Sequence, residues 1–482
     1  MYPTGPVSET VHVRRADWSA ARKFAGHLNR TYNMDSTLKK ITDFTTQLSY
    51  SDLPPLAVHE CKRRVIDTLA CALGGFNAEP SKIARSIARK VTSENSARIL
   101  GTLERSSPEL AAFANGVMIR YLDVNDATGS GGGHPSDAFA ALLAAAETSK
   151  IDGKTFITAA VIVYELYLGF FSAVRIRNRG WDHVVYTVLA AAAGVAKIKQ
   201  LDYKATANAL SFALTPNMAL EVVRRGQLSM WKGCAGANAS RNALFAAELA
   251  AEGMTAPGQV FEGEQGVWNA TGKFEWPLFA RQDRPFRIAD SQIKIYPCEY
   301  HGQAPIEATL AIRSQINPED IESIVVRTYW FAWSEIGSEP EKWKPTTRET
   351  ADHSIPFLVC AALLDGKVDA STFSAARISD SYLLSLIQKV QVIHDKELDK
   401  MQPLANPCRL EITLRNGEKK FSSVDHPKGH VKNPASDQDI KDKLVDLNNG
   451  LLSPRQISRL LDLCWRLDEL DDIGELVSVI QI

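Results

Sequence analysis

The residues with the clearest chemical potential lie in one short stretch, residues 122–137, which combines acids, a run of glycines, a proline turn and a histidine. The histidine, His134, can move a proton near neutral pH. Glycines let the backbone approach a ligand closely, and an alanine-rich helix expected from Ala138 would present its N-terminus to negative charge. The stretch therefore predicts a proton-transfer site for a small anion, with Ser136 or Asp137 as the helix cap.

Four further segments carry cations, histidines or both next to predicted helix starts and turns. Arginines and lysines in such places suit carboxylate binding, and a histidine there could exchange protons. Each segment also fits an ordinary structural role: a satisfied buried histidine, a solvated charged loop, an exposed strand face or a helix cap. The side chains in question are His183, Arg224, Arg225, Lys232, Lys294, Tyr296, Glu299, His301 and His353.

Several common catalytic motifs are absent from the sequence. It has no G-x-S-x-G nucleophile elbow, no Walker phosphate loop and no H-E-x-x-H zinc helix. The glycine run at 129–133 lacks the preceding strand and the spacing of a dinucleotide fingerprint, which argues against a nicotinamide cofactor. The seven cysteines are scattered and form no CxxC pair, which predicts free thiols in a reducing compartment rather than a zinc or iron–sulfur site.

The composition is that of an ordinary globular protein. The 482 residues are 45% hydrophobic and 23% charged with a net charge of −1, so the chain is long enough for two domains and has no basic field to attract nucleic acid or membrane. No apolar run approaches the roughly 18 residues that span a bilayer, so we expect no membrane segment.

Residues 1–34 are rich in arginine and poor in acids, which predicts a flexible extension: a disordered tail, extra residues before a start at Met34, or a transit peptide. The expected location is the cytoplasm or, with a transit peptide, the mitochondrion.

Apolar residues recur at helical spacing through most of residues 35–275. Many of these segments are alanine-rich and apolar on most sides, as in helices packed in the middle of a bundle. We therefore predict a large all-helical first domain. Its expected helices begin at about residue 36 and then cover residues 58–73, 111–121, 138–149, 157–171, 184–198, 205–215 and 235–252.

The pattern changes after Gly253, because proline, glycine and aromatic residues dominate residues 254–285. Short β-like runs then alternate with two helices at 305–315 and 355–364. Residues 276–436 therefore predict a smaller α+β domain. Its expected strands cover residues 287–289, 293–296, 321–329, 390–394, 408–414 and 419–424, with a hairpin turn at Asn416-Gly417 between the last two. Amphipathic helices return at 437–482 and are expected to pack on the first domain. The predicted fold is mainly α with α+β, the smaller domain being inserted before the C-terminal helices.

Five short motifs occur in one order that resembles the MmgE/PrpD family, whose members include 2-methylcitrate dehydratase, cis-aconitate decarboxylase and iminodisuccinate epimerase. Each motif is weak alone, but five in register are specific, and the likeness covers the chain from about residue 35 onward. The motifs are Asp123 with His134-Pro-Ser-Asp, Trp181-Asp-His183-Val, Trp231-Lys232-Gly, Lys294-x-Tyr-Pro-x-Glu-x-His301 and Glu349-Thr-Ala-Asp-His353.

The resemblance implies a homodimer in which each chain has a large helical domain and a smaller lid domain. It implies an active site between the two domains that acts on a small carboxylate without a metal or an organic cofactor. It also implies the roles of individual residues. Catalysis is assigned to Asp123, His134, His183, Lys232 and Lys294, substrate binding to Gly133, Ser136, Arg225, Tyr296 and His301, and a supporting role to His353.

The function expected from these residues is a lyase of the 2-methylcitrate dehydratase type, a hydro-lyase that removes a proton beside a carboxylate and then water. The lysines would hold the charge that builds on the carboxylate. The two histidines would act as base and acid, with Asp123 orienting His134. The alternatives are an epimerase or isomerase of a small dicarboxylate, a decarboxylase of the cis-aconitate type and, least favoured, a helical binding protein without catalysis.

Two features of the sequence separate it from the best-known members. In the decarboxylases a tyrosine follows the strand expected at 321–328, whereas here an ungapped count from Lys294 reaches Trp333, with Tyr329 four residues earlier. The dehydratases often carry bulky residues between the aspartate and the His-Pro-Ser-Asp motif, whereas this chain has small residues at 127–133. The first feature argues against decarboxylation, and the second predicts a pocket open to a larger or different acid.

Overall fold

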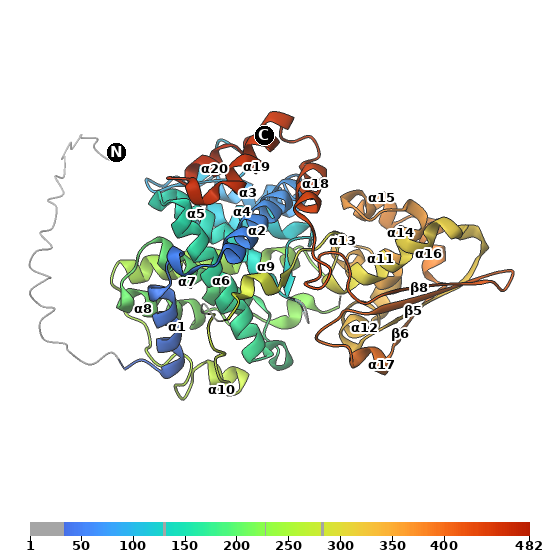
Figure 1. Cartoon of the computed structure of the whole chain (residues 1–482), viewed down its shortest axis with the longest axis horizontal. Coiled ribbons are helices and arrows are strands. Elements are labelled where there is room, and N and C mark those ends of the chain that lie inside the picture. The colour runs from blue at the N-terminus through green and yellow to red at the C-terminus, as the bar shows by residue number, and fades with distance from the viewer. Residues whose placement is uncertain (1–32, 129–131, 227, 281–283) are drawn as a thin grey trace, which may run out of the picture.

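The computed structural model describes residues 33–128, 132–226, 228–280 and 284–482. Within them the chain forms a large helical domain and a smaller α+β domain that lie side by side (Figure 1). The predicted fold class is confirmed. The predicted extension falls almost entirely on residues 1–32, and part of the glycine run falls on 129–131, so these parts of the prediction lie outside the described residues.

Helices make up most of the large domain. They are α1 (Ser36–Gln47), α2 (Pro55–Gly74), α3 (Glu79–Ala88), α4 (Pro108–Tyr121), α5 (Phe139–Ser149), α6 (Gly153–Ala173), α7 (Val184–Ile198), α8 (Tyr203–Leu214), α9 (Trp231–Ala251) and α10 (Val267–Thr271). Small residues on the contact faces let these helices pack closely. A methyl group added at Gly116 of α4 would lie 2.8 Å from the Cβ of Ala237 in α9. The high alanine content noted in the sequence therefore serves close helix packing.

Helix α6 departs from one expectation drawn from the sequence. With 21 residues, this helix is long and apolar enough to cross a membrane, by length and composition alone. The expectation that no apolar run approaches the roughly 18 residues of a membrane span is therefore wrong. However, 89% of its most apolar window is buried inside the protein. Its side chains belong to the core of the large domain, together with those of α5 and α7. The apolar run is therefore accounted for by packing within this domain.

The smaller domain is a four-stranded sheet with helices packed against it (Figure 1). The strands are β5 (Ile321–Thr328), β6 (Val390–His394), β7 (Cys408–Leu414) and β8 (Lys419–Val424), in the order β6–β5–β7–β8. β5 and β6 run parallel, and the other neighbours are antiparallel. Every second residue of β7 is buried, as its alternating sequence predicts, and the predicted hairpin joins β7 to β8. The helices are α11 (Gln303–Ile312), α12 (Trp330–Ile336), α13 (Arg348–Ala351), α14 (Ile355–Asp365), α15 (Ala375–Ile378), α16 (Ser381–Ile387) and α17 (Lys396–Asp399).

The segment that joins the two domains differs from its prediction. The strands predicted at 287–289 and 293–296 are wrong, because the first is a turn of 3-10 helix and only the residues between them are extended, as β4 (Ser291–Gln292). Side chains satisfy much of the backbone here in place of a strand ladder. Arg64 on α2 donates hydrogen bonds to two carbonyls of the segment, and Gln303 on α11 accepts from two of its amides. An alternating sequence cannot reveal such long-range partners.

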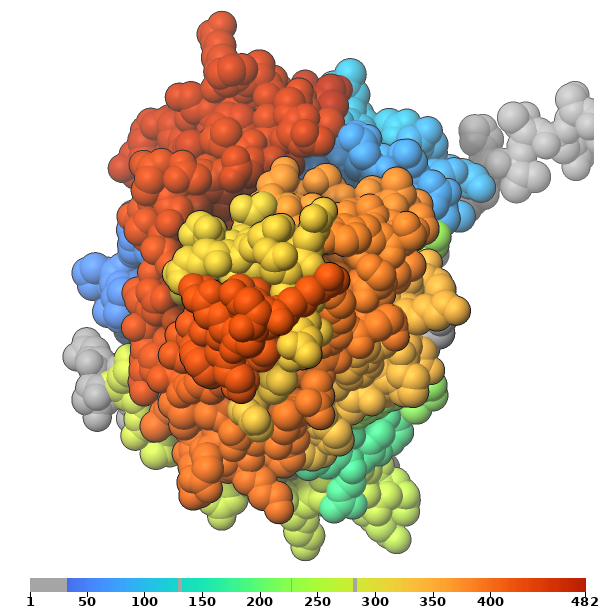
Figure 2. Space-filling view, turned by 90° about the vertical axis from the view of Figure 1, so that its right-hand side faces the viewer, coloured from blue at the N-terminus to red at the C-terminus, as the bar shows by residue number. Residues whose placement is uncertain are grey.

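The C-terminal helices lie on the large domain. α18 (Asp437–Asn448) packs along α2, and α19 (Pro454–Trp465) and α20 (Gly474–Ser478) follow it. Their apolar side chains belong to the large core, as does Ile293, which lies beyond the domain boundary predicted at residue 276. Figure 2 shows these helices beside the small domain, which occupies the front of that view. The chain therefore leaves the large domain, builds the smaller one and returns.

Candidate active site

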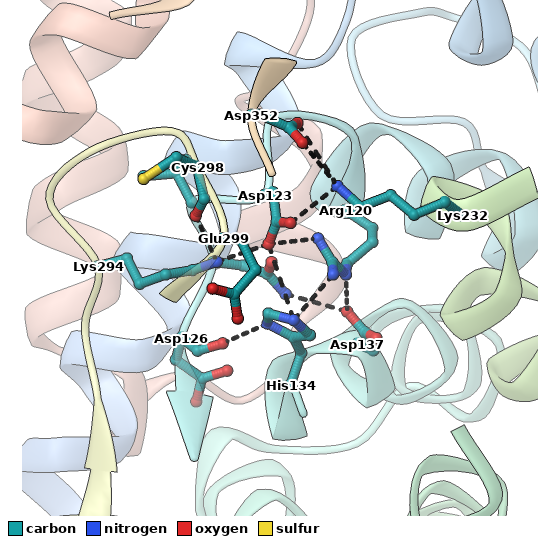
Figure 3. A network of polar contacts seen from close by, with 12 residues as sticks. Arg120, Asp123, Asp126, His134, Asp137, Lys232, Lys294, Cys298, Glu299 and Asp352 are labelled. Carbon is teal, nitrogen blue, oxygen red and sulfur yellow. Dashed lines mark hydrogen bonds and ion pairs between the residues drawn. The ribbon is translucent and has the colours of Figure 1, made fainter. Parts of the chain in front are cut away.

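Asp123 lies at the centre of a buried ionic cluster (Figure 3). Its carboxylate is 2.7 Å from Nη1 of Arg120, 2.8 Å from Nζ of Lys232 and 2.5 Å from Nζ of Lys294. Burial alone would raise the pKa of Asp123, but the three cations outweigh burial and hold that pKa well below its usual value. Asp123 also has a φ of 54°, a left-handed conformation that is uncommon outside glycine and is often found at functional sites.

Distant parts of the chain supply this cluster. Arg120 stands in the last turn of α4, shortly before Asp123, and Lys232 stands in the first turn of α9. Lys294 follows β4, which pairs with β3 (Ala127–Thr128) and so brings the joining segment next to the residues that follow Asp123. The fold thus places two of the predicted catalytic side chains, Lys232 and Lys294, within ion-pair distance of a third, Asp123.

A second carboxylate, Asp352, completes what we call the Asp123 cluster. Its Oδ1 lies 3.3 Å from Lys232 Nζ, and Arg348 Nη1 lies 2.9 Å from its Oδ2. His353 Nδ1 is 2.6 Å from Asp352, and His353 Nε2 is 3.9 Å from Asp123. The two carboxylates and His353 are close enough together to hold a metal ion, but the Lys232 ammonium already lies between the carboxylates. The donor set therefore fits an ammonium better than a metal.

His134 is fixed beside the cluster in one tautomer. Its Nδ1 is 2.7 Å from the carbonyl oxygen of Asp126, which can only accept, so Nδ1 carries the proton. Its Nε2 is 2.8 Å from Nη2 of Arg120, which can only donate, and 3.7 Å from Asp123. Burial, Arg120 and Lys294 together hold the pKa of His134 well below its usual value. His134 therefore donates its orienting hydrogen bond to the Asp126 carbonyl, whereas the sequence predicted that Asp123 orients it.

His183 is a second neutral imidazole, and its ring centre lies 5.5 Å from that of His134. Its Nδ1 is 3.3 Å from the hydroxyl of Tyr167, and the same hydroxyl accepts a hydrogen bond from the His134 amide at 3.0 Å. Burial lowers the pKa of His183 to about 3, although Asp182 opposes the shift from 3.6 Å. Gly133 adjoins this group, because a methyl group on it would lie 2.6 Å from Tyr167 Oη. Both histidines are therefore uncharged at neutral pH and able to accept a proton.

The loop that carries His134 is held by its own side chains and by α6. Asp126 Oδ1 accepts from the Ser136 amide at 3.0 Å, and its Oδ2 accepts from the Tyr164 hydroxyl at 2.7 Å. Asn125 donates both to the Ser136 hydroxyl and to Asp137. Neither Ser136 nor Asp137 caps the following helix, so the predicted cap is wrong. Both side chains hold the loop, and burial raises the pKa of Asp137 to about 6.

Arg225 lies nearer the surface than the Asp123 cluster, in an outer ionic group. In this group Arg177 and Arg225 of the large domain pair with Glu335 of the smaller one. The Arg225 side chain is 49% exposed and lies 3.6 Å from Glu335 of α12 and 3.8 Å from Glu221. Arg177 contacts the same two carboxylates, at 3.1 Å for Glu335 and 2.5 Å for Glu221. A methyl group added at Gly132 would lie 3.7 Å from Arg177, so this outer ionic group borders Gly132.

The smaller domain contributes a hydrogen-bonded pair, His301 and Tyr329. His301 Nδ1 contacts the hydroxyl of Tyr329, which directly follows β5, and both side chains are buried. Burial raises the pKa of Tyr329 well above its usual value, so the phenol keeps its proton. The turn that holds His301 is tied to the Asp123 cluster, because the Glu299 amide donates to the Asp352 carbonyl at 2.9 Å.

The predicted site residues therefore fall into distinct positions. At or beside the Asp123 cluster lie Asp123, Gly133, His134, His183, Lys232, Lys294 and His353. Ser136 lies within the supporting loop, Arg225 in the outer ionic group, and His301 beside Tyr329. Tyr296 packs against the core of the smaller domain, and no hydrogen bond recorded among the described residues joins its side chain to the cluster.

Sequence reasoning misses Arg120 altogether. The position of Asp352 shortly before an apolar helix predicts only that its side chain caps that helix. The side chains that cap the starts of α13 and α14 are those of Thr347 and Ser354, so this interpretation of Asp352 is wrong. A signal for Arg120 does exist, because it is a charged residue inside an apolar helical pattern, three residues before Asp123. A buried arginine needs a carboxylate partner, and that spacing supplies one.

These groups can bind an anion and move protons. Three cations converge on Asp123, so the cluster can accept the charge of a substrate carboxylate. The two neutral imidazoles beside it can exchange a proton with a bound molecule.

Two family models match most of the chain. The model described as the MmgE/PrpD N-terminal domain matches residues 39–276, and the MmgE/PrpD C-terminal domain matches residues 296–467. The chain is 25% identical over 471 residues to the cis-aconitate decarboxylase-like protein oryM of Aspergillus oryzae, covering 92% of this chain and 96% of that protein. It is 27% identical over 467 residues to the 2-methylcitrate dehydratase of Salmonella typhimurium, covering 90% and 94%. The same identity, over 461 residues, relates it to the 2-methylcitrate dehydratase of Escherichia coli, covering 89% and 93%.

Proposed function

Because the chain belongs to the MmgE/PrpD family, we propose that it is a lyase that removes water from a small di- or tricarboxylic acid, in the manner of a 2-methylcitrate dehydratase. The observation that carries the proposal is the meeting of three cations at Asp123 beside two neutral imidazoles. Such a site can hold a carboxylate and take a proton from the carbon next to it, and those are the two requirements of this elimination.

In the proposed reaction Lys232 and Lys294 hold the substrate carboxylate, and Asp123 keeps both lysines in place. His134 takes the proton from the neighbouring carbon, and the electron pair of that C–H bond forms a double bond as the C–O bond to the hydroxyl breaks. The negative charge of the bound substrate favours a proton on His183, which takes one from solvent as the substrate binds. His183 then gives that proton to the departing hydroxyl, which leaves as water, and His134 releases its own proton to solvent, so both imidazoles are neutral again.

The base is assigned to His134 because of its tautomer. The Asp126 carbonyl holds the proton on Nδ1, so the lone pair of His134 is on Nε2, where it accepts from Arg120. This lone pair becomes free for the substrate proton when Arg120 turns to the substrate carboxylate. A carboxylate held by the lysines would bring its neighbouring carbon to that side. His183 then remains for the acid role.

The proposal is tested first with His134→Ala. Loss of a proton-transfer residue lowers kcat by roughly 10²–10⁴-fold, and we expect a loss of that size with 2-methylcitrate as substrate. His59→Ala is the matched control, because His59 lies half-exposed on α2 beside Asp437 and away from the cluster. Full activity in a folded His134→Ala variant would contradict the proposal.

A decarboxylase of the cis-aconitate type is the second candidate. It is favoured by Tyr329, which follows β5 and contacts His301 although an ungapped count had pointed to Trp333, and by the likeness to the protein from Aspergillus oryzae. A proton NMR screen against 2-methylcitrate, citrate and cis-aconitate distinguishes the candidates. Loss of water supports the dehydratase, and loss of carbon dioxide supports the decarboxylase. Solvent deuterium in recovered substrate without either loss supports an epimerase.

We also propose that the chain works as a homodimer. Several large apolar side chains around the start of α9 are exposed to solvent, namely Leu220, Val222, Met230 and Trp231. Three of them border a cavity of about 370 Å³ that shares no residue with the Asp123 cluster. Contiguous apolar surface of this kind supports association with a second copy. Light scattering coupled to size exclusion should give twice the mass of one chain, and a monomer at all concentrations would contradict this.

A further inference from the structure

A lysine of the C-terminal helix α18 reaches into the interior behind the Asp123 cluster. Lys443 is buried, and its Nζ lies 2.5 Å from Asp67 Oδ1, 2.7 Å from the carbonyl oxygen of Val124 and 2.7 Å from the carbonyl oxygen of Lys294. An ammonium has three N–H donors. All three are therefore used, and the three acceptors come from three separate parts of the chain.

Two of these acceptors belong to segments that carry active-site side chains. Val124 directly follows Asp123, and the second carbonyl is that of Lys294 itself. The side chains of Asp123 and Lys294 meet at 2.5 Å, so Lys443 holds the backbones of two residues whose side chains form an ion pair. Both carbonyls are buried, and a buried carbonyl without a donor is costly.

The backbone at Lys294 is held by single contacts and not by a strand ladder, because β4 ends at Gln292. Directly after Lys294, Gln303 accepts from the amides of Ile295 and Tyr296. On its other side, Ile293 donates to the carbonyl of Gly429 at 3.2 Å, and a methyl group on Gly429 would lie 1.8 Å from the Ile293 carbonyl oxygen. The position of Lys294 thus depends on a few single contacts, of which those from Gly429 and Lys443 come from residues far along the chain.

We propose that Lys443 is a positioning residue of the active site: its ammonium, anchored on Asp67, fixes the Val124 and Lys294 carbonyls and so sets the distance between Asp123 and Lys294. Lys443 touches no substrate. It acts through the two backbones that it joins. The inference rests on the proposed function for its kinetic consequence, whereas its structural consequence is independent of which substrate is used.

The experiment compares Lys443→Met with Lys441→Met, a half-buried lysine on the same helix. A misplacement of about 1 Å can cost 10²-fold in rate, so we expect kcat/KM to fall roughly 10- to 100-fold in Lys443→Met and by less than twofold in the control. The acid limb of the pH–rate profile should also move to higher pH. Lys294 helps to hold down the pKa of both Asp123 and His134, so its displacement raises both. A purely structural role would leave that limb in place.

The double variant Asp67→Asn with Lys443→Met guards against a folding failure. Lys443→Met alone leaves the Asp67 carboxylate buried without its cation, which can unfold a protein. In the double variant that charge is gone, while the Val124 and Lys294 carbonyls still lack their donor. It should therefore fold and still show the loss in kcat/KM.

Crystal structures of the same variants separate this inference from the proposed function. A longer distance between Asp123 and Lys294 than in the wild type supports the positioning role, even if the protein does not dehydrate 2-methylcitrate. An unchanged distance in the folded double variant overturns it. Wild-type kcat/KM and an unmoved acid limb in that variant overturn it as well.

Discussion

The two domains contribute differently to the candidate site, because the smaller domain adds one carboxylate, Asp352, to the Asp123 cluster and otherwise supplies an uncharged pair. The large domain and the joining segment supply Asp123 with its three cations, all charged and all buried. The smaller domain supplies His301 and Tyr329, a hydrogen-bonded pair extended by Asn406, which donates to the Tyr329 hydroxyl at 3.0 Å. We call the Asp123 cluster the ionic half of the site and interpret it as the part that selects carboxylates. We call His301, Tyr329 and Asn406 the polar half and interpret it as the part that distinguishes one reaction of the family from another.

Lys294→Met tests the ionic half and should have the largest effect. Removal of one group that stabilises developing charge typically costs 10²–10³-fold, so we expect kcat/KM to fall by about that much for every carboxylate that the enzyme accepts. Steady-state kinetics measure the loss. Lys400→Met is the control, because the Lys400 side chain is 71% exposed on the smaller domain. A fall in kcat/KM of less than about fivefold in Lys294→Met would contradict the assignment of carboxylate binding to the ionic half.

The neutral state of His183 should appear as a pH dependence of stability. His183 titrates near 3 in the folded protein and near 6.5 in an unfolded chain, so between these values the unfolded chain binds more protons and stability falls as the pH falls. Between pH 7 and pH 5 this amounts to about 2 kcal/mol.

Urea unfolding at the two pH values, with wild type and His183→Asn, checks that expectation. The wild type should lose more stability on going to pH 5 than the variant does. Asp137 acts in the opposite direction, since its pKa is raised to about 6, and it remains in both proteins. Equal losses in both proteins would show that His183 is charged when folded.

Tyr329→Phe tests the polar half and should have a smaller effect. The variant removes one hydrogen bond to His301, worth about 0.5–1.5 kcal/mol, so we expect kcat to fall by up to about tenfold with little change in KM. Tyr300→Phe is the matched control, because the Tyr300 hydroxyl donates to Asn406 at 3.3 Å and makes no recorded contact with His301 through that hydroxyl. A larger loss in the control than in Tyr329→Phe would reverse the assignment.

Glu335→Gln should have the smallest effect. Glu335 joins α12 to Arg177 and to the half-exposed Arg225, and both arginines keep Glu221 as a partner when the charge of Glu335 is removed. We expect less than a fivefold change in kcat/KM, measured at low and at high salt. A loss of kcat/KM as large as that of Lys294→Met would show that the outer ionic group also takes part in binding the carboxylate.

The helices of the large domain were the easiest part to predict from sequence. The prediction of 184–198 coincides with α7, because apolar spacing and local propensity agree there. The strands at 390–394, 408–414 and 419–424 are confirmed as well. The joining segment was predicted wrongly, since Arg64 and Gln303 satisfy its backbone from far along the chain.

The residues of the candidate site that lie in short sequence motifs could be predicted. Those that join the site only through contacts made in the folded chain could not. Asp123, Lys232 and Lys294 lie in recognisable motifs, and the fold brings them together. Arg120 lies in no such motif, although it contacts both Asp123 and His134. The tautomer of His134 depends on a backbone carbonyl, which no side-chain pattern encodes.

The return of the chain to the large domain has a consequence for protein synthesis. Domains generally fold in the order in which the ribosome delivers them, the N-terminal one first. Here α18 is needed to cover the apolar side chains of α2, and it follows the smaller domain in the chain. The large domain therefore cannot complete its folding until the smaller domain has been synthesised. A nascent chain halted before residue 437 would therefore carry a foldable small domain on a large domain whose apolar surface is still open, and this is the stage at which a chaperone would be needed most.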